Sequence, residues 1–481
     1  MDSDLDIIYA DATELAQLIR TGKVSPIRVV EAFLARIQRI NPKLNAIVTV
    51  DADTALREAQ AAEAAVRAGR TDLGPLHGVP FTVKDSIDTA GVPTQRGSPI
   101  FAGRIPTADA TAVARMKAAG AILLAKTNLP EFSLATDSDS PLTGRTNNPW
   151  DLRRTPGGSS GGEAAAIAAG LSPLGLGTDL AISVRGPAAH AGIVALKPTL
   201  GRIPMTGVWP RAPRRFWHVG PMARTVRDVA LAYAVLAGPD GKDGFSSVTP
   251  STSARTSSSS STAITGVDRL LRVGWLVEPG FGPVDSEVAA TVEKAAQALQ
   301  RTGRVAVARV RIPALEEENA LDVFMRLLVN EVQPVLREAT AGQPDDKIFA
   351  VARGLLQRPA TPTDEYVRAE QAAERLRDGF AAYFQHYDAL LCPVLPISGY
   401  EHAAKQLRIN QNEVPVSHVM SATVPLNVTG LPGLSMRFGT SSEGMPINVQ
   451  IVGSWYAEST VLHVASLLEG VSAVKGLFPK L

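Results

Sequence analysis

Two adjacent serines lie inside a glycine-rich stretch, and this stretch constrains the fold more than any other feature of the chain. It reads Thr155-Pro156-Gly157-Gly158-Ser159-Ser160-Gly161-Gly162-Glu163 and leads directly into an alanine-rich run. Glycine reaches backbone conformations that other residues avoid, and it lets neighbouring groups approach the backbone closely. The sequence therefore predicts a loop whose hydroxyl groups are placed for chemistry rather than for packing.

A lysine and a further serine accompany this loop. Lys84 ends the apolar run that starts at Gly78, and Ser183 follows the block Gly177-Thr178-Asp179. A serine hydroxyl is a weak nucleophile unless an adjacent base takes its proton. The seven histidines share no motif with either serine, whereas a lysine can act as the base if burial keeps it neutral. Because Lys84 ends an apolar run, we expect it to be buried.

Together these residues resemble the amidase signature family, whose members cleave amides, and in some cases esters or carbamates, with a Ser–Ser–Lys triad. Further blocks that resemble the family follow in the family's order along nearly the whole chain: Thr143-Gly144, Asn148–Asp151, Leu196–Arg202, Gly220–Thr225 and Gly444–Gly453. The resemblance implies that Ser183 is the nucleophile, Ser159 the bridging serine that relays protons, and Lys84 the base. It also implies a cis peptide bond between Gly158 and Ser159.

The resemblance places an oxyanion hole at four consecutive backbone N–H groups, those of Leu180, Ala181, Ile182 and Ser183. Such groups hold the negative charge that develops on the substrate. The common family pattern has a glycine pair before the serine, where this chain has Ala181-Ile182. Isoleucine at positive φ is an outlier, so we expect either ordinary dihedrals in this loop or a reshaped hole. Asp179 and Arg185 flank the loop, and the resemblance implies that they pair and brace it.

Two further segments are candidates for substrate contact. Glu131–Asp137 resembles a segment that lines the acyl or leaving-group side in relatives, which makes Ser133 and Thr136 candidate substrate-binding residues; Ser160 in the glycine-rich loop is a third. Trp209–His218 holds three arginines among aromatic residues. It is either a lid that stacks on an aromatic group or binds an anion, or a proline-rich surface loop with solvated arginines.

The remaining sequence predicts an α/β fold. Apolar spacing indicates helices from Asp11 to Gly22, from Ser25 to Ile40 and from Asp53 to Arg67. Buried strands are expected at 79–83, 121–125 and 389–394, with helices at 111–119 and 163–170, and this alternation favours a layered α/β fold with a mixed or parallel sheet. The resemblance implies one α/β/α layered domain with a large twisted mixed sheet over residues 1–481. Residues 246–262 are rich in serine and are expected to form a surface insertion.

Composition excludes several classes of protein. The net charge of +1 favours neither nucleic acid nor an anionic membrane as a partner. No apolar run approaches the ~20 residues of a membrane span, and Met1–Asp6 lacks the pattern of a secretory signal, so we expect a cytoplasmic protein. Cys392 is the single cysteine, so we expect a core thiol and no cysteine-ligated zinc. The triad needs no cofactor or metal, and none is expected.

Several functions remain open at this point. The favoured hypothesis is an amidohydrolase that cleaves a small amide, anilide or carbamate (urethane) through an acyl-enzyme on Ser183. An alternative is the glutaminase subunit of a tRNA-dependent amidotransferase, which has the same triad and works with a partner subunit. An esterase that uses Gly157-Gly158-Ser159-Ser160-Gly161 as a G-x-S-x-G motif, and an inactive binding protein, are the others. The sequence leaves the oligomeric state open.

Overall fold

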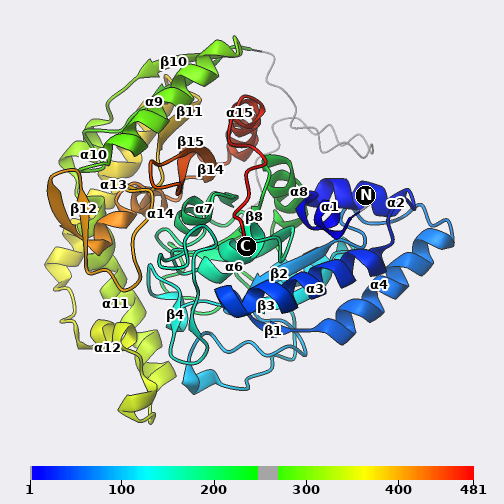
Figure 1. Ribbon diagram of the computed structural model, residues 1–481. Helices are drawn as coiled ribbons and strands as arrows, with labels where there is room; N and C mark the ends of the chain where they lie inside the picture. The colour runs from blue at the N-terminus through cyan, green and yellow to red at the C-terminus, as the bar shows by residue number, and fades with distance from the viewer. Residues whose placement is uncertain (1–2, 247–268) are drawn as a thin grey trace.

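A mixed sheet of eleven strands runs through the part of the molecule that the structure describes (Figure 1). The structure, a computed structural model, describes residues 3–246 and 269–481. The strand order is β1-β3-β2-β6-β8-β7-β14-β15-β11-β9-β10, with parallel pairing of β3 to β2 to β6 and of β11 to β9 to β10. The strands between β6 and β11 pair antiparallel. The predicted α/β fold with a large mixed sheet is confirmed.

The strands are β1 (Ile47–Val50), β2 (Pro80–Lys84), β3 (Ile122–Thr127), β4 (Asp139–Ser140), β5 (Gly144–Arg145), β6 (Leu174–Asp179), β7 (Val194–Lys197), β8 (His218–Ala223), β9 (Leu271–Trp275), β10 (Val305–Arg309), β11 (Ala389–Pro393), β12 (Gln406–Ile409), β13 (Asn412–Pro415), β14 (Gly433–Thr440) and β15 (Pro446–Gly453). The α-helices are α1 (Asp4–Tyr9), α2 (Ala12–Arg20), α3 (Pro26–Leu44), α4 (Ala52–Arg67), α5 (Thr111–Ala118), α6 (Gly161–Ala168), α7 (Arg185–Ala191), α8 (Val226–Leu236), α9 (Ser286–Arg301), α10 (Pro313–Glu317), α11 (Ala320–Thr340), α12 (Ala350–Gln357), α13 (Thr363–Phe384), α14 (Val424–Thr429) and α15 (Glu458–Gly470).

The helix starts follow from local side-chain chemistry. The Asp11 carboxylate accepts a hydrogen bond from the N–H of Glu14 at the start of α2, at 2.9 Å. Ser25 caps α3, and Pro26 occupies the first position, where its missing N–H costs nothing. Each capping group satisfies an N–H that has no partner inside the helix. These starts, and the predicted helices and strands named above, agree with the structure to within a few residues.

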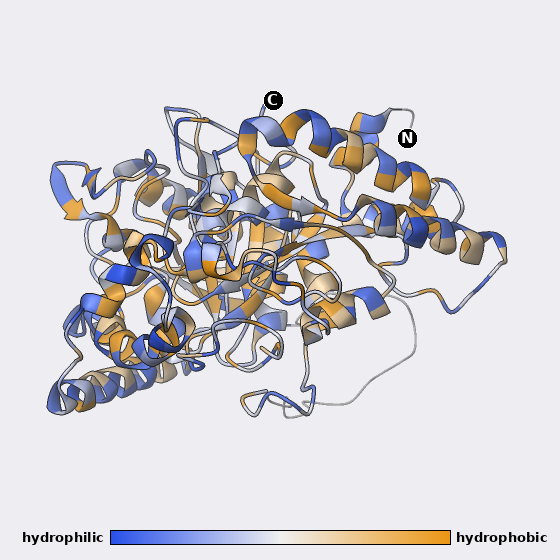
Figure 2. Ribbon diagram, turned by 90° about the horizontal axis from the view of Figure 1, so that it is seen from below, coloured by the Kyte–Doolittle hydropathy of each residue, from blue (hydrophilic) through white to orange (hydrophobic). Residues whose placement is uncertain are grey.

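The core lies along the sheet. Every position of β2, β3, β6 and β11 is buried, as expected for strands that are covered on both faces. Figure 2 shows hydrophobic residues concentrated around the central strands, while the outer helices carry hydrophilic residues on their outward sides. Cys392 on β11 is fully buried and is a core thiol, as predicted.

The topology brings the predicted triad strands together. Strands β2 and β6 are parallel neighbours, so Lys84 at the end of β2 and Asp179 at the end of β6 meet at one edge of the sheet. Helix α6, which follows the glycine-rich loop, packs on β2, β6 and β8, and against α7. A site formed at the carboxyl ends of neighbouring parallel strands is the usual position in an α/β sheet.

Two expectations fall outside what the structure tests. The predicted serine-rich insertion at 246–262 lies outside the described residues, apart from Ser246. A single domain over residues 1–481 stays a prediction. Within the described residues, no helix is both long and apolar enough to span a membrane.

Candidate active site

The glycine-rich loop packs closely against the backbone of residues 135–137, which precede β4. Gly157 has a φ of 78°, and the peptide bond between Gly158 and Ser159 is cis, as the family resemblance implied. A Cβ atom on Gly158 would lie 2.6 Å from the carbonyl oxygen of Ala135 and 2.7 Å from the nitrogen of Asp137. A side chain at this position would therefore push the loop away from residues 135–137, which is why the loop needs glycine there.

Lys84 contacts Ser159 directly. It is fully buried, and its Nζ donates hydrogen bonds to Ser159 Oγ at 2.6 Å and to Thr178 Oγ1 at 2.9 Å. Burial holds the pKa of Lys84 well below its ordinary value, and the nearby carboxyl groups of Asp179 and Glu163 oppose this effect only in part. Since a neutral amine can accept a proton, this geometry suits a base that acts on Ser159.

Ser183 lies in the loop that joins β6 to α7, beside the glycine-rich loop. The N–H of Ser160 donates to the carbonyl oxygen of Ser183 at 3.2 Å, so the two serine-bearing loops are joined by a backbone hydrogen bond. Ser183 is 4% exposed, whereas Ser159 is completely buried. Of the two serines, Ser183 is the one that lines a pocket, which is the position that a nucleophile requires.

The loop ahead of Ser183 has ordinary backbone dihedrals. Neither Ala181 nor Ile182 has a positive φ, so the first of the two expected arrangements is found. Within the described part of the chain, the N–H groups of residues 180–183 have no hydrogen-bond acceptor, whereas the next N–H, that of Val184, donates to Asp179 Oδ2 at 3.1 Å. Free N–H groups beside Ser183 are suited to receive an oxyanion.

A pocket of about 420 Å³ opens over Ser183. Aliphatic, aromatic and methionine side chains make up most of its wall, and they come from residues 134–135, 180–182, α11, α12 and the segment before α14. The side-chain hydroxyls in the wall belong to Ser133, Thr136, Ser183 and Ser417. A mostly apolar pocket with a few polar groups beside a nucleophile is typical of a site for a small organic substrate.

Comparison with known proteins identifies the family. The sequence matches the Amidase family over residues 28–462. The chain belongs to the amidase signature family. A glutamyl-tRNA(Gln) amidotransferase subunit from Symbiobacterium thermophilum is 36% identical, with 94% of this chain and 95% of that protein covered.

Solved structures extend this comparison. A 6-aminohexanoate cyclic dimer hydrolase superposes with a TM-score of 0.87 at 31% identity, over 98% of this chain and 99% of that one. A bacterial aryl acylamidase of the amidase signature family superposes with a TM-score of 0.86 at 26% identity, covering 96% of both chains. The chain is thus an amidase-family enzyme, of a family that includes hydrolases and amidotransferase subunits.

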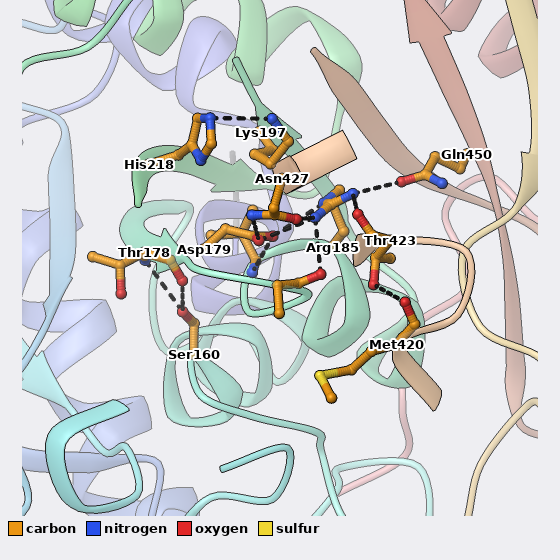
Figure 3. A network of polar contacts seen from close by, with 12 residues as sticks. Ser160, Thr178, Asp179, Arg185, Lys197, His218, Met420, Thr423, Asn427 and Gln450 are labelled. Carbon is orange, nitrogen blue, oxygen red and sulfur yellow. Dashed lines mark hydrogen bonds and ion pairs between the residues drawn. The ribbon is translucent and has the colours of Figure 1, made fainter. Parts of the chain in front are cut away.

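In this member of the amidase signature family, a buried ion pair braces the loop that joins β6 to α7 (Figure 3). Arg185 Nε lies 3.0 Å from Asp179 Oδ2, and both side chains are fully buried. Burial works against ionisation of Asp179, but Arg185 and Asn427 outweigh it and hold the pKa of that carboxyl below its ordinary range. Arg185 Nη2 also donates to the carbonyl oxygen of Ala181 at 3.2 Å. The pair therefore fixes the loop formed by residues 180–183, which line the pocket.

Sequence reasoning missed the C-terminal partners of this pair. Asn427 accepts from Arg185 Nη2 at 2.5 Å and donates to Asp179 Oδ1 at 2.9 Å. Gln450 and the carbonyl group of Thr423 accept from Arg185 Nη1, both at 3.0 Å. Gln450 lies in the C-terminal block that resembles the family, which was a signal, whereas nothing in the sequence around Asn427 pointed to this contact. Thr423 at the start of α14, Asn427 within α14 and Gln450 on β15 thus hold the Asp179–Arg185 pair in place.

The predicted substrate contacts are only partly assembled. Ser133 and Thr136 line the pocket with Ser183. Ser160 does not: its hydroxyl donates to the carbonyl oxygen of Thr178 at 3.2 Å and accepts from the N–H of Thr178 at 3.3 Å. The Ser160 oxygen attaches the glycine-rich loop to β6, and a contact between Ser160 and substrate stays a prediction.

The Trp209–His218 loop is neither a free lid nor a solvated surface loop. None of its residues is part of the wall of the pocket over Ser183. Arg215 pairs with Glu331 on α11 and Glu370 on α13, and Arg214 pairs with Asp243 at 2.5 Å. Arg211, 59% exposed, comes closest to the solvated arginine that was expected. Arg215 thus attaches the loop to α11, whose residues form part of the pocket wall, and Arg214 attaches it to Asp243, which follows α8.

Proposed function

We propose that this enzyme is an amidohydrolase that cleaves the C–N bond of a small, largely apolar amide, anilide or carbamate through an acyl-enzyme on Ser183. The observation that carries this proposal is the composition of the pocket wall over Ser183. Phe324, Met325 and Leu328 on α11 lie there with Leu355 on α12. Side chains of this kind favour an acyl or aryl group, since they offer buried apolar area and few polar partners.

The proposed chemistry uses the contacts described above. Lys84 takes the proton of Ser159, and Ser159 takes the proton of Ser183 while Ser183 Oγ attacks the carbonyl carbon. The N–H groups of residues 180–183 stabilise the oxyanion of the tetrahedral intermediate. When the intermediate collapses, the C–N bond breaks and the proton returns through Ser159 to the leaving amine. A water molecule, deprotonated through the same relay, then attacks the acyl carbon and releases Ser183.

The 36% identity to an amidotransferase subunit supports a second candidate function. In that case the enzyme would release ammonia from glutamine for a partner subunit. Glutamine carries an ammonium and a carboxylate, and both need polar partners in a pocket. Among the wall residues that the structure describes, Arg358 is the one with a charged side chain. The apolar wall therefore supports the hydrolase, and the sequence comparison supports the amidotransferase component.

A substrate panel separates the two candidates. Purified enzyme is assayed with acetyl and hexanoyl anilides, an aryl carbamate, a matched aryl ester and glutamine, and the enzyme labelled with a fluorophosphonate is digested and mapped. We expect labelling at Ser183 and the highest kcat/KM for an anilide or a carbamate. Glutamine as the best substrate, or copurification with a second subunit that raises glutaminase activity, would favour the amidotransferase. Labelling at Ser159 would contradict the assignment of the nucleophile.

A further inference from the structure

A buried carboxyl group that takes no step in this chemistry lies beside the base. Glu163, in the first turn of α6, is fully buried. Its Oε1 accepts a hydrogen bond from the hydroxyl of Thr82, and its Oε2 accepts from the hydroxyl of Thr127 at 2.8 Å. Thr82 is two residues before Lys84 on β2, and Thr127 on β3 is the cross-strand partner of Lys84. The carboxyl is therefore held by the two strands that carry and flank the base.

A glycine on the neighbouring strand β6 leaves space for this carboxyl. Gly175 on β6 is the register partner of Thr82, and a Cβ atom on Gly175 would collide with Oε1 of Glu163. A glycine in the middle of a strand weakens it and often marks a close approach by another group. The close approach here is that of Glu163, so three strands contribute to its place in the structure.

The charges around this carboxyl come from both neighbouring strands. Burial raises the pKa of Glu163 to about 7, while Lys126 and Lys84 favour its ionised form. Burial likewise lowers the pKa of Lys126 to about 8, and the charge of Arg104 lowers it further. The carboxyl groups of Asp85, Asp88 and Glu163 act in the opposite direction and raise it. The carboxyl groups that face Lys84 are those of Asp179 and Glu163. Asp179 is already paired with Arg185, so Glu163 is the one without an arginine partner.

We propose that Glu163 is a positioning residue for Lys84, which fixes the lysine against Ser159 and sets the pH range over which the amine can accept a proton. This inference rests on the proposed function, in which Lys84 is the base. An ionised Glu163 favours the ammonium form of Lys84. It therefore makes the base less available before the reaction, and it stabilises the lysine after the proton has arrived from Ser159.

The test compares Glu163→Gln with a control variant, Asp228→Asn. Glutamine keeps the size of the side chain and can still bond to both threonines, but it carries no charge. Asp228 is another buried carboxyl bonded by a threonine hydroxyl, at 2.7 Å from Thr13, and it lies on α8 away from Lys84. Both variants are followed by the rate of Ser183 labelling with a fluorophosphonate against pH. The NMR titration of the Lys84 side chain, identified by its loss in Lys84→Met, is recorded in parallel.

We expect the midpoint of the pH profile to shift in Glu163→Gln and to stay unchanged in Asp228→Asn. Without the carboxylate the pKa of Lys84 falls, so the midpoint of the labelling profile moves to lower pH by on the order of one unit. Below the wild-type midpoint, labelling then rises about tenfold, because a one-unit shift changes the neutral fraction tenfold. Asp228→Asn keeps the wild-type midpoint. A folded Glu163→Gln enzyme with the wild-type midpoint in both measurements would overturn the proposal.

Failure of the proposed function and failure of a variant to fold can each be separated from failure of the role of Glu163. If Ser183 is not labelled in the wild type, the proposed function fails, and the NMR titration of Lys84 still decides the role of Glu163. If Glu163→Gln does not fold, Thr127→Val replaces it. That variant removes one hydrogen bond to the ionised carboxyl, so Glu163 ionises less readily and the midpoint shifts in the same direction by a smaller amount. An unchanged midpoint in folded Thr127→Val would then count against the proposal.

Discussion

Ile182 faces the substrate pocket on one side and packs against α7 on the other. It is 3% exposed and forms part of the pocket wall, and a Cβ atom on Gly186 would lie 2.5 Å from its Cγ1. Replacement by alanine keeps the backbone dihedrals and removes three carbon atoms. We therefore expect Ile182→Ala to enlarge the pocket next to the N–H groups of residues 180–183.

The cost in stability follows from the burial. At about 0.8 kcal/mol for each buried methylene, the lost carbons account for roughly 2–3 kcal/mol of unfolding free energy. The cavity penalty adds little, because the space opens into a pocket rather than into a closed core. We thus expect the low end of the ~2–5 kcal/mol range for large-to-small core changes. Ile19→Ala on α2, where the side chain is fully buried away from the pocket, is the matched control.

The assay measures urea unfolding together with kcat/KM for acetyl and hexanoyl anilides. We expect the hexanoyl-to-acetyl ratio to rise about tenfold in Ile182→Ala, since a methylene that fits or fails to fit a pocket is worth ~1–3 kcal/mol. Ile19→Ala should lose stability and keep the wild-type ratio. An unchanged ratio in a folded Ile182→Ala enzyme would show that the side chain only packs against α7.

Three other predictions concern the triad and its support. Ser183→Ala should abolish turnover and covalent labelling, while the circular dichroism spectrum stays that of the native protein. In Ser159→Ala, the fluorophosphonate should still label Ser183, but slowly. Labelling at the wild-type rate in Ser159→Ala would contradict the proton relay. Lys84→Met should lower kcat/KM by at least ~10²-fold. Lys84→Arg should be equally impaired, because a guanidinium stays protonated and cannot accept a proton. Wild-type activity in Lys84→Arg would refute a neutral base. Asp179→Asn leaves the Arg185 charge unpaired and should cost ~3–5 kcal/mol of unfolding free energy. Because the pKa of Asp179 is depressed in the folded state, the wild-type advantage over Asp179→Asn should be complete above the unfolded pKa of about 3.9 and shrink as pH falls below it; an advantage that grows on acidification would contradict this.

Much of the site follows from patterns that act locally. Glycine at 157 and 158, the apolar run that ends at Lys84 and the block before Ser183 indicated a tight loop, a buried base and a second serine without any knowledge of contacts. The choice between ordinary and left-handed dihedrals at Ile182 could not be made from the sequence, because the family pattern has glycine there. The structure decided it, with no positive φ at either Ala181 or Ile182.

Other parts of the site depend on contacts between distant segments. The hydroxyl of Ser160 looked available for substrate, and it is used instead on Thr178, 18 residues away in sequence. The arginines of residues 209–218 were expected either in a lid or on a solvated surface loop, and Arg215 instead pairs with residues of α11 and α13. In both cases the polar side chain bonds to a partner from another element, which the local sequence does not indicate.

The sequence by itself determined the fold class, the helix starts and the buried strands, because these depend on periodicity and on capping groups within a few residues. It also indicated the triad candidates, because their motifs resemble those of the amidase signature family. Only the tertiary structure decided what surrounds them. Examples are the support of Arg185 by Asn427, 242 residues away, the apolar pocket wall from α11 and α12, and the hydrogen bonds of Glu163 to threonines on β2 and β3. Burial and the pairing of charges depend on which segments meet, and that is settled when the sheet brings β2, β6 and the C-terminal strands together.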